Sequence, residues 1–263
     1  MARIDNLNNF LTDVAESIRT KKGTTDLISP SNFDTEIESI ESGGGDLSEY
    51  FTETIDKGVS YSNAGWYKVI KKLPPFDFNG TSTTYMFAYF MGAKIDFSNF
   101  DTSKTTTMEG MFYYAGNSSN PIELDLRTLN MSNVTNTELM FNYGQIKSIN
   151  MENCDLSKVT RAMNMFGGMN STYFTNLIFG KNYGAGFSTS TSANNVNYKL
   201  DISAGKNLTE ASLISVLNGL YDIKTKGCNP QQCVLGSTNL AKLTSEAGQT
   251  ALAQATSYGW SIS

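Results

Sequence analysis

Residues 95–112 read IDFSNFDTSKTTTMEGMF, and this stretch decides the fold because two further stretches align with it without a gap. The second copy, residues 124–141, reads LDLRTLNMSNVTNTELMF, and the third, residues 149–166, reads INMENCDLSKVTRAMNMF. A shortened earlier copy is indicated around Phe76-Asp77-Phe78 and Met86-Phe87, and weaker later copies start near Leu177 and Leu200. The middle of the chain is therefore an internal repeat.

Each copy ends in a phenylalanine, and consecutive members of this series are 25, 29 and 25 positions apart. A period in the twenties, with one apolar-polar-apolar strand per unit, is typical of a leucine-rich-repeat-like β solenoid. Side chains alternate along a strand, so the apolar positions of every copy share one interior, and each unit rests on its neighbours. The expected repeat core consists of Phe87, Ile95, Phe97, Phe112, Leu124, Leu126, Phe141, Ile149, Met151 and Phe166.

Polar residues recur where each copy must turn. Asp101, Asn130 and Asp155 occupy the same position of the three copies, and their side chains can accept hydrogen bonds from turn amides. Asp96 and Asp125 also recur in repeat register. We therefore expect these acidic residues to be structural, and we predict no catalytic pair of carboxylates.

The first forty residues are predicted to be helical. Their apolar residues are spaced 3, 4, 3 and 4 positions apart, which is the pattern of a helix pair or a coiled coil. These residues are Ile4, Leu7, Leu11, Val14 and Ile18. Lys21-Lys22-Gly23 ends this helix, and Ser29-Pro30 starts a second one.

Two interpretations of this helical hairpin remain open. It can pack on its own chain as an ordinary amphipathic hairpin, or its apolar stripe can mediate self-association or docking on a larger assembly. We favour the second because Gly43-Gly44-Gly45 separates the hairpin from the rest of the chain, and because so short a helix is marginal alone. Residues 1–42 are thus expected to form an attachment or oligomerisation module.

The remaining segments complete an α+β organisation. Residues 46–78 are expected to form a short β-rich connector, residues 79–206 the solenoid, and residues 207–263 a C-terminal cap that shields the last repeat from water. In this cap Leu208-Thr209-Glu210-Ala211 starts a helix that buries Leu213, Val216, Leu217 and Leu220. A second helix runs from Thr244, as N-cap, to about Thr256, and a final strand contains Trp260 and Ile262.

Composition excludes several classes of function. The chain of 263 residues has 20 Lys+Arg against 25 Asp+Glu, and the net charge of -5 gives no attraction for nucleic acids or anionic membranes. The absence of His excludes hydrolases that need a His base and most zinc enzymes. Cys228 and Cys233 can form a small hairpin disulfide or remain thiols, while Cys154 is expected to fill the core. We predict neither a metal nor a cofactor.

The repeats resemble a known family. Residues 95–112 and 124–141 closely resemble the phrase DLSNFDTSNVTNMxxMF of the BspA-like variety of leucine-rich repeat, found in bacterial adhesins and in tail proteins of phages of Gram-positive bacteria. Residues 15–23 and 28–33 resemble the amino-terminal module of such tail proteins, and residues 235–243 with Gly259-Trp260 resemble the cap that follows these repeats. This resemblance implies a structural, non-enzymatic virion protein of a phage tail appendage, such as a tail fibre or baseplate subunit.

The partners implied are further copies of the chain, with a trimer as one form of the homo-oligomer, other tail or virion proteins, and host cell-wall glycan. Exposed aromatic residues near the ends of the repeats, namely Tyr113, Tyr114, Tyr143 and Tyr173, are the candidates for surface binding. One alternative is a bacterial cell-surface adhesin, which normally carries a signal peptide and an anchor that are not apparent here. The other is a glycan-degrading tail enzyme.

Overall fold

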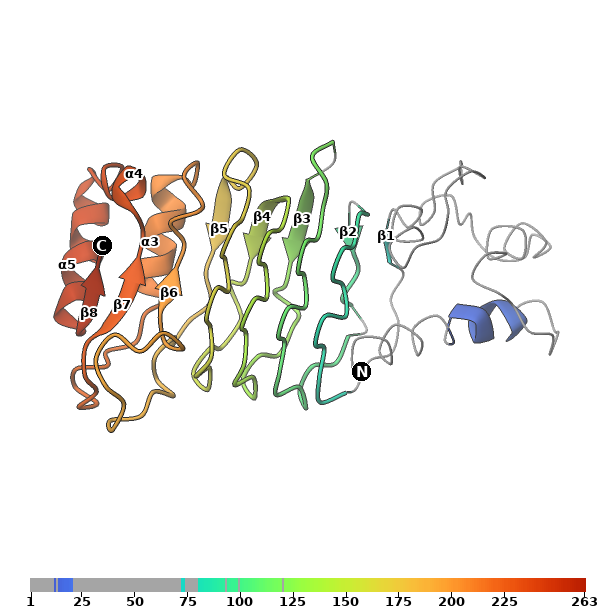
Figure 1. The fold of residues 1–263 in the computed structure, drawn as a ribbon, viewed down its shortest axis with the longest axis horizontal. Coiled ribbons are helices and arrows are strands. Elements are labelled where there is room, and N and C mark those ends of the chain that lie inside the picture. The colour runs from blue at the N-terminus through green and yellow to red at the C-terminus, as the bar shows by residue number, and fades with distance from the viewer. Residues whose placement is uncertain are drawn as a thin grey trace.

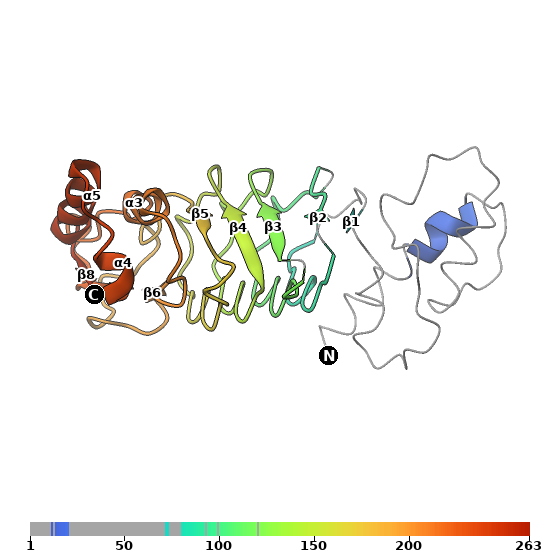
Figure 2. The ribbon, with the colours of Figure 1, turned by 90° about the horizontal axis from the view of Figure 1, so that it is seen from above.

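The computed structural model describes residues 12, 14–20, 72–73, 80–92, 94–98, 100–119 and 121–263. Five short strands lie side by side in chain order along its long axis (Figure 1). They are β1 (Lys72–Leu73), β2 (Lys94–Ile95), β3 (Ile122–Asp125), β4 (Ile146–Asn150) and β5 (Asn176–Ile178). The helices of the C-terminal part gather at one end, as the view from above also shows (Figure 2).

Neighbouring strands are parallel and follow the register of the repeat. β1 pairs with β2, and β3, β4 and β5 form a three-stranded sheet in that order. Leu124, Ile149 and Leu177 are direct partners across this sheet. The first two occupy the same position of the second and third copies, and Leu177 begins a later copy, so equivalent positions lie side by side.

A second row of contacts joins the copies on the return segment. Parallel bridges link Ser82, Thr107, Asn136 and Arg161, which are 25, 29 and 25 positions apart. A series of overlapping turns, which we call the turn ribbon, follows each bridge. Along this ribbon one backbone amide donates a hydrogen bond to a carbonyl group of the next copy, and the following amide donates to a carbonyl group of its own copy. For example, the Phe112 amide donates to Met140 O at 2.8 Å, whereas the Tyr113 amide donates to Gly110 O at 2.9 Å.

The phenylalanine of each copy stacks on that of the next. The ring centroids of Phe87 and Phe112 are 5.7 Å apart, those of Phe112 and Phe141 are 5.7 Å apart, and those of Phe141 and Phe166 are 5.2 Å apart. The expected core residues are all buried except Ile95, which is half-buried and packs against the core. The core is therefore a continuous column shared by successive copies.

Short side chains close the turns between these layers. Asp101, Asn130 and Asp155 each accept a hydrogen bond from the amide two residues later, at 2.8, 3.0 and 3.1 Å. The predicted turn role of these residues is confirmed. Asp96 and Asp125 likewise each accept a hydrogen bond from the amide two residues later, at 2.9 and 3.3 Å.

The C-terminal part contains three helices. α3 (Glu210–Asn218) begins as predicted, and its N-cap Thr209 accepts the Ser212 amide. A short helix α4 (Ser237–Leu240) precedes α5 (Glu246–Ser257). The predicted N-cap of α5 was wrong by one residue, because the hydroxyl of Ser245, and not that of Thr244, accepts the Gly248 amide.

The buried face of the first cap helix is confirmed. Leu213, Val216 and Leu217 of α3 are buried, and Leu220 is buried just beyond its end. The predicted final strand is also present as β8 (Trp260–Ile262).

The last weak copy forms a strand, β6, that does not pair with β5 and so does not extend the row of strands from β1 to β5. β6 (Leu200–Asp201) pairs with β7 (Gln231–Val234), and β7 pairs with β8. The outer edge of β5 is covered instead by α3, whose Ser212 and Ser215 hydroxyls accept the amides of Leu177 and Phe179, both at 2.9 Å. These hydroxyls replace the carbonyl groups that another strand would supply.

At the N-terminal end, residues 14–20 are helical, as predicted. Within this stretch Ile18 is buried and Val14 is half-buried. Ile4, Leu7, Leu11, the second helix predicted from Ser29-Pro30 and the connector apart from β1 lie outside the described residues. No helix in the described part of the chain is both long and apolar enough to span a membrane.

Candidate binding surface

Three tyrosines form a stacked row on the surface of the repeats. Tyr89, Tyr114 and Tyr143 occupy the same position of successive copies, two residues after the core phenylalanine. Their ring centroids are 5.3 Å apart between Tyr89 and Tyr114, with an interplanar angle of 11°, and 4.8 Å apart between Tyr114 and Tyr143, with an angle of 27°. We call these three residues the tyrosine ladder. Tyr114 is 39% exposed and Tyr143 is 46% exposed.

The backbone under the tyrosine ladder is held in an uncommon conformation. The φ angles of Tyr89, Tyr114 and Tyr143 are 62°, 55° and 57°, in the left-handed region that bulky residues rarely adopt. Each of these amides donates to a carbonyl group of the next copy, at 2.7, 2.9 and 2.9 Å respectively. The recurrence of this strained conformation at one repeat position shows that bonding between copies sets where the rings point.

Tyr113 packs edge to face against the ladder, and Tyr85 packs edge to face against Tyr113. Tyr113 is half-buried, and its ring lies 4.7 Å from that of Tyr114 and 5.6 Å from that of Tyr85, with interplanar angles of 71° and 89°. Edge-to-face and offset-stacked pairs are the favourable geometries for aromatic rings. The ladder and these two residues therefore form one rigid aromatic surface.

The faces of the ladder rings are largely occupied. Tyr114 has a stacked ring on each side, and the Tyr143 ring lies over Gly168 of the following copy, where an added Cβ would be 2.4 Å from Cε1 of Tyr143. A sugar stacked on a ring face therefore does not fit Tyr114. The surface exposes mainly ring edges and phenol hydroxyls.

The structure brings together three of the four tyrosines named from the sequence. Tyr113, Tyr114 and Tyr143 lie in this surface, whereas Tyr173 is half-buried, and no ring contact joins it to the ladder in the described part of the chain. The sequence analysis missed Tyr85 and Tyr89. The signal for Tyr89 was present, since it follows Phe87 by the same two positions that separate Tyr114 from Phe112.

The carboxylates near the repeats are engaged in structural contacts. The Arg127 guanidinium, bonded to the two carboxylate oxygens of Asp125 at 2.9 and 2.7 Å, lowers the pKa of that carboxyl group. Hydrogen bonds from Ser103, first from its amide, lower the pKa of Asp101. A general acid needs a raised pKa, and these shifts have the opposite sign. Among the described residues, no group of three or more potential metal ligands is close together.

All three cysteines are free thiols. Burial raises the pKa of Cys154 and of Cys233 to about 12, so neither is a nucleophile near neutral pH. Cys228 is half-buried, and its Sγ lies 3.6 Å from the carbonyl oxygen of Phe187. The structure therefore has plain thiols where the sequence left a Cys228–Cys233 disulfide open.

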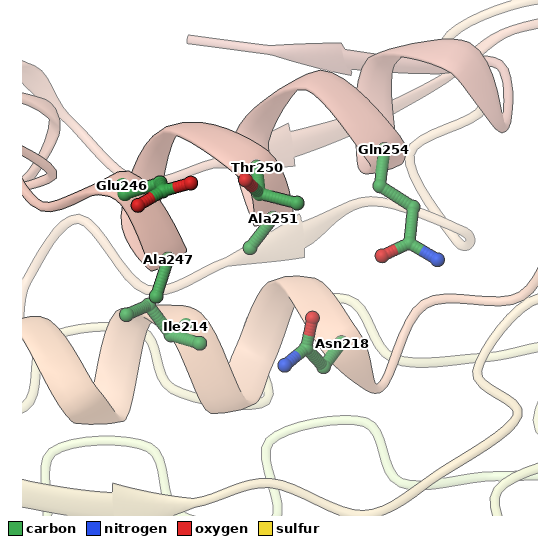
Figure 3. A pocket seen from close by; sticks show the side chains of 7 residues that line it. All are labelled: Ile214, Asn218, Glu246, Ala247, Thr250, Ala251 and Gln254. Carbon is green, nitrogen blue, oxygen red and sulfur yellow. The ribbon is translucent and has the colours of Figure 1, made fainter.

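One open groove lies between α3 and α5, as Figure 3 shows. It is lined by Ile214 and Asn218 of α3 and by Glu246, Ala247, Thr250, Ala251 and Gln254 of α5. Small aliphatic groups and neutral amides dominate this lining, with a single carboxylate at the first turn of α5. The groove therefore lacks a paired acid and base, and the tyrosine surface is the stronger candidate site.

Comparison with known proteins identifies the repeats only. Residues 71–178 match a family of BspA-like repeats described as "Mycoplasma protein of unknown function, DUF285". The matched range extends from β1 to the last residue of β5, where α3 covers the edge of the sheet. No curated protein and no solved structure matches the chain.

Proposed function

We propose that this chain is a structural, non-enzymatic subunit of a phage tail appendage that presents a repeat surface for adhesion to the host cell envelope. In this proposal residues 79–206 form a leucine-rich-repeat-like β solenoid, and residues 207–263 close its C-terminal end. The in-register pairing of the copies supports the solenoid. The phage assignment is supported by the resemblance of residues 15–23, 28–33 and 235–243, with Gly259-Trp260, to tail proteins.

The tyrosine ladder is the observation that carries the adhesive role. Tyrosine offers a large amphipathic contact area with little side-chain freedom to lose, which suits it to binding surfaces. Here the ring positions are already fixed by stacking and by hydrogen bonds between copies, so little ordering accompanies binding. A core aromatic would be buried, yet Tyr114 and Tyr143 remain substantially exposed.

Residues 1–42 supply the attachment in this proposal. Their apolar stripe would join copies of the chain into a homo-oligomer or dock them on other tail proteins. Several copies of a weakly binding surface on one particle convert low affinity into avidity. The resulting protein would be located in the virion tail and would use no cofactor.

The test is sedimentation of the fluorescently labelled chain with intact Gram-positive cells. The double variant Tyr114→Asn, Tyr143→Asn removes both rings, and Asn suits the left-handed backbone, as Asn164 does at φ 55°. We expect cell binding to fall about tenfold or more, as for loss of a central aromatic contact. The matched control is Tyr221→Asn, because Tyr221 is also 39% exposed but is not in the ladder.

Equal loss of binding in the double variant and in the control would show that the ladder is not the adhesive surface. Absence of any binding by the unaltered chain to a panel of such cells would contradict the adhesive role itself.

A further inference from the structure

We propose that the tyrosine ladder binds a linear, neutral, 1,4-β-linked glycan that lies along the long axis of the molecule and is contacted by ring edges and phenol hydroxyls. This inference rests on the proposed adhesive function and specifies the ligand and its mode of binding. Four observations lead to it: the occupied faces of the Tyr114 and Tyr143 rings, their phenol hydroxyls, the paired charges of the turn ribbons and the spacing of the rings.

The occupied ring faces exclude the usual stacking mode. Protein aromatics commonly contact a sugar through the face of the ring, but Tyr114 has Tyr89 on one side and Tyr143 on the other. The Tyr143 ring lies between Tyr114 and Gly168. At Tyr114 and Tyr143 a ligand on this surface therefore meets the outer edges of the rings.

Those edges carry hydroxyl groups that are available to a ligand. Neither phenol hydroxyl of Tyr114 or Tyr143 has a hydrogen-bond partner within the part of the chain that the structure describes. Each hydroxyl can donate one hydrogen bond and accept others, which is the chemistry that sugar hydroxyls complement. The alternation of apolar ring edge and hydroxyl also matches the mixed C–H and O–H surface of a pyranose.

Charged side chains of the same turn ribbons are already paired. Arg161 donates to Glu138 at 2.6 Å, and Asn136 donates to Glu109 at 3.0 Å. Arg161, the one cation among these four residues, is therefore already paired with a carboxylate. This arrangement, together with the net charge of -5, favours a neutral ligand over a polyanion.

The spacing of the rings selects an extended glycan over a peptide. Successive ladder rings, each from the next copy, are 5.3 and 4.8 Å apart. An extended peptide advances by about 3.3 Å per residue and repeats its facing side chains at roughly twice that distance, so it falls out of step with the ladder. In an extended 1,4-β-linked glycan the advance per pyranose is similar to the ~4.8 Å between neighbouring strands. Successive pyranoses are turned over, as the residues of an extended peptide are, so the match to the ladder is in the advance per unit. One sugar can therefore lie beside each tyrosine.

The experiment titrates chitohexaose, a 1,4-β-linked hexamer of N-acetylglucosamine, into the full-length chain by calorimetry. Maltohexaose, whose 1,4-α linkages curve the chain, is the control ligand. The key variant is Tyr114→Phe, Tyr143→Phe, which keeps both stacked rings and removes only the hydroxyls. Tyr221→Phe is its matched control.

We expect chitohexaose to bind the unaltered chain at least tenfold more tightly than maltohexaose does, and the double Phe variant to lose at least tenfold in affinity with an unchanged thermal midpoint. Full binding by the double Phe variant would overturn the hydroxyl-edge mode. Equal binding of the two hexamers would overturn the selection of an extended chain. If the unaltered chain sediments with cells but does not bind chitohexaose, the glycan inference fails and the adhesive function stands; if it binds neither, both fail.

Discussion

At the scale of single residues, the most informative position is the glycine that ends the tyrosine ladder. Gly168 has φ 62°, the same left-handed conformation as the ladder tyrosines of the preceding copies. The Tyr143 ring lies in the space that a side chain at Gly168 would need. The ladder stops at Tyr143 because that ring occupies the next position in the row.

This packing predicts the effect of Gly168→Ala. The added Cβ would lie 2.4 Å from the Tyr143 ring, and alanine at positive φ is strained by about 1 kcal/mol. We therefore expect the free energy of unfolding, measured with urea, to fall by roughly 1–3 kcal/mol. Gly227→Ala is the matched control, because Gly227 has φ 85° and nothing within 4 Å of an added Cβ. An equal loss in both variants would mean that the Tyr143 ring moves aside freely.

At the scale of secondary-structure elements, α3 terminates the row of strands. Its start and its buried Leu213, Val216 and Leu217 follow from the sequence, because they depend on local spacing and on the N-cap Thr209. The role of its two serines could not be predicted. They bond the β5 amides from 35 and 36 positions away, and nothing local indicates which edge a serine will cover.

We predict that Ser212→Ala destabilises the fold by about 1–3 kcal/mol, because it leaves the buried Leu177 amide without an acceptor. Chemical denaturation followed by circular dichroism measures this change. Ser257→Ala is the control, since the Ser257 hydroxyl is exposed and bonds only within α5. If Ser212→Ala lowers the free energy of unfolding no more than Ser257→Ala does, water has replaced the Ser212 hydroxyl as acceptor for the Leu177 amide.

The same element accounts for the position of the last weak copy, the one that starts near Leu200. A strand does form at Leu200–Asp201, but it pairs with β7 because α3 already occupies the edge of β5. Periodicity in a sequence indicates that a strand will form; it does not indicate which edge remains free to receive it.

At the scale of the whole molecule, the phenylalanine column links the stability of the copies. Its spacing was readable from the sequence because a repeat places identical residues at equal intervals. The surface tyrosines were only partly readable, because Tyr85 and Tyr89 belong to a shortened first copy in which the repeat phrase is weak.

Phe141→Ala is predicted to reduce the free energy of unfolding by about 3–5 kcal/mol, since the ring is fully buried between those of Phe112 and Phe166. Because each copy rests on its neighbours, we expect one cooperative transition at lower urea concentration. Phe141→Leu refills most of the volume of the ring. We expect it to lower the free energy of unfolding by less than half as much as Phe141→Ala does. A second, separate transition in the Ala variant would show that the copies unfold independently.

The insertion between the first and second full copies shows that the stack tolerates units of unequal length. The interval from Phe112 to Phe141 is 29 positions instead of 25 and contains the loop-type segment 116–121, yet the two rings stack with an interplanar angle of only 1°. Duplication of one unit within the gene would therefore add a layer without disturbing those beside it. Through evolution the repeat stack would therefore change in length by whole units. The length of polymer that it can bind would change by the same increments.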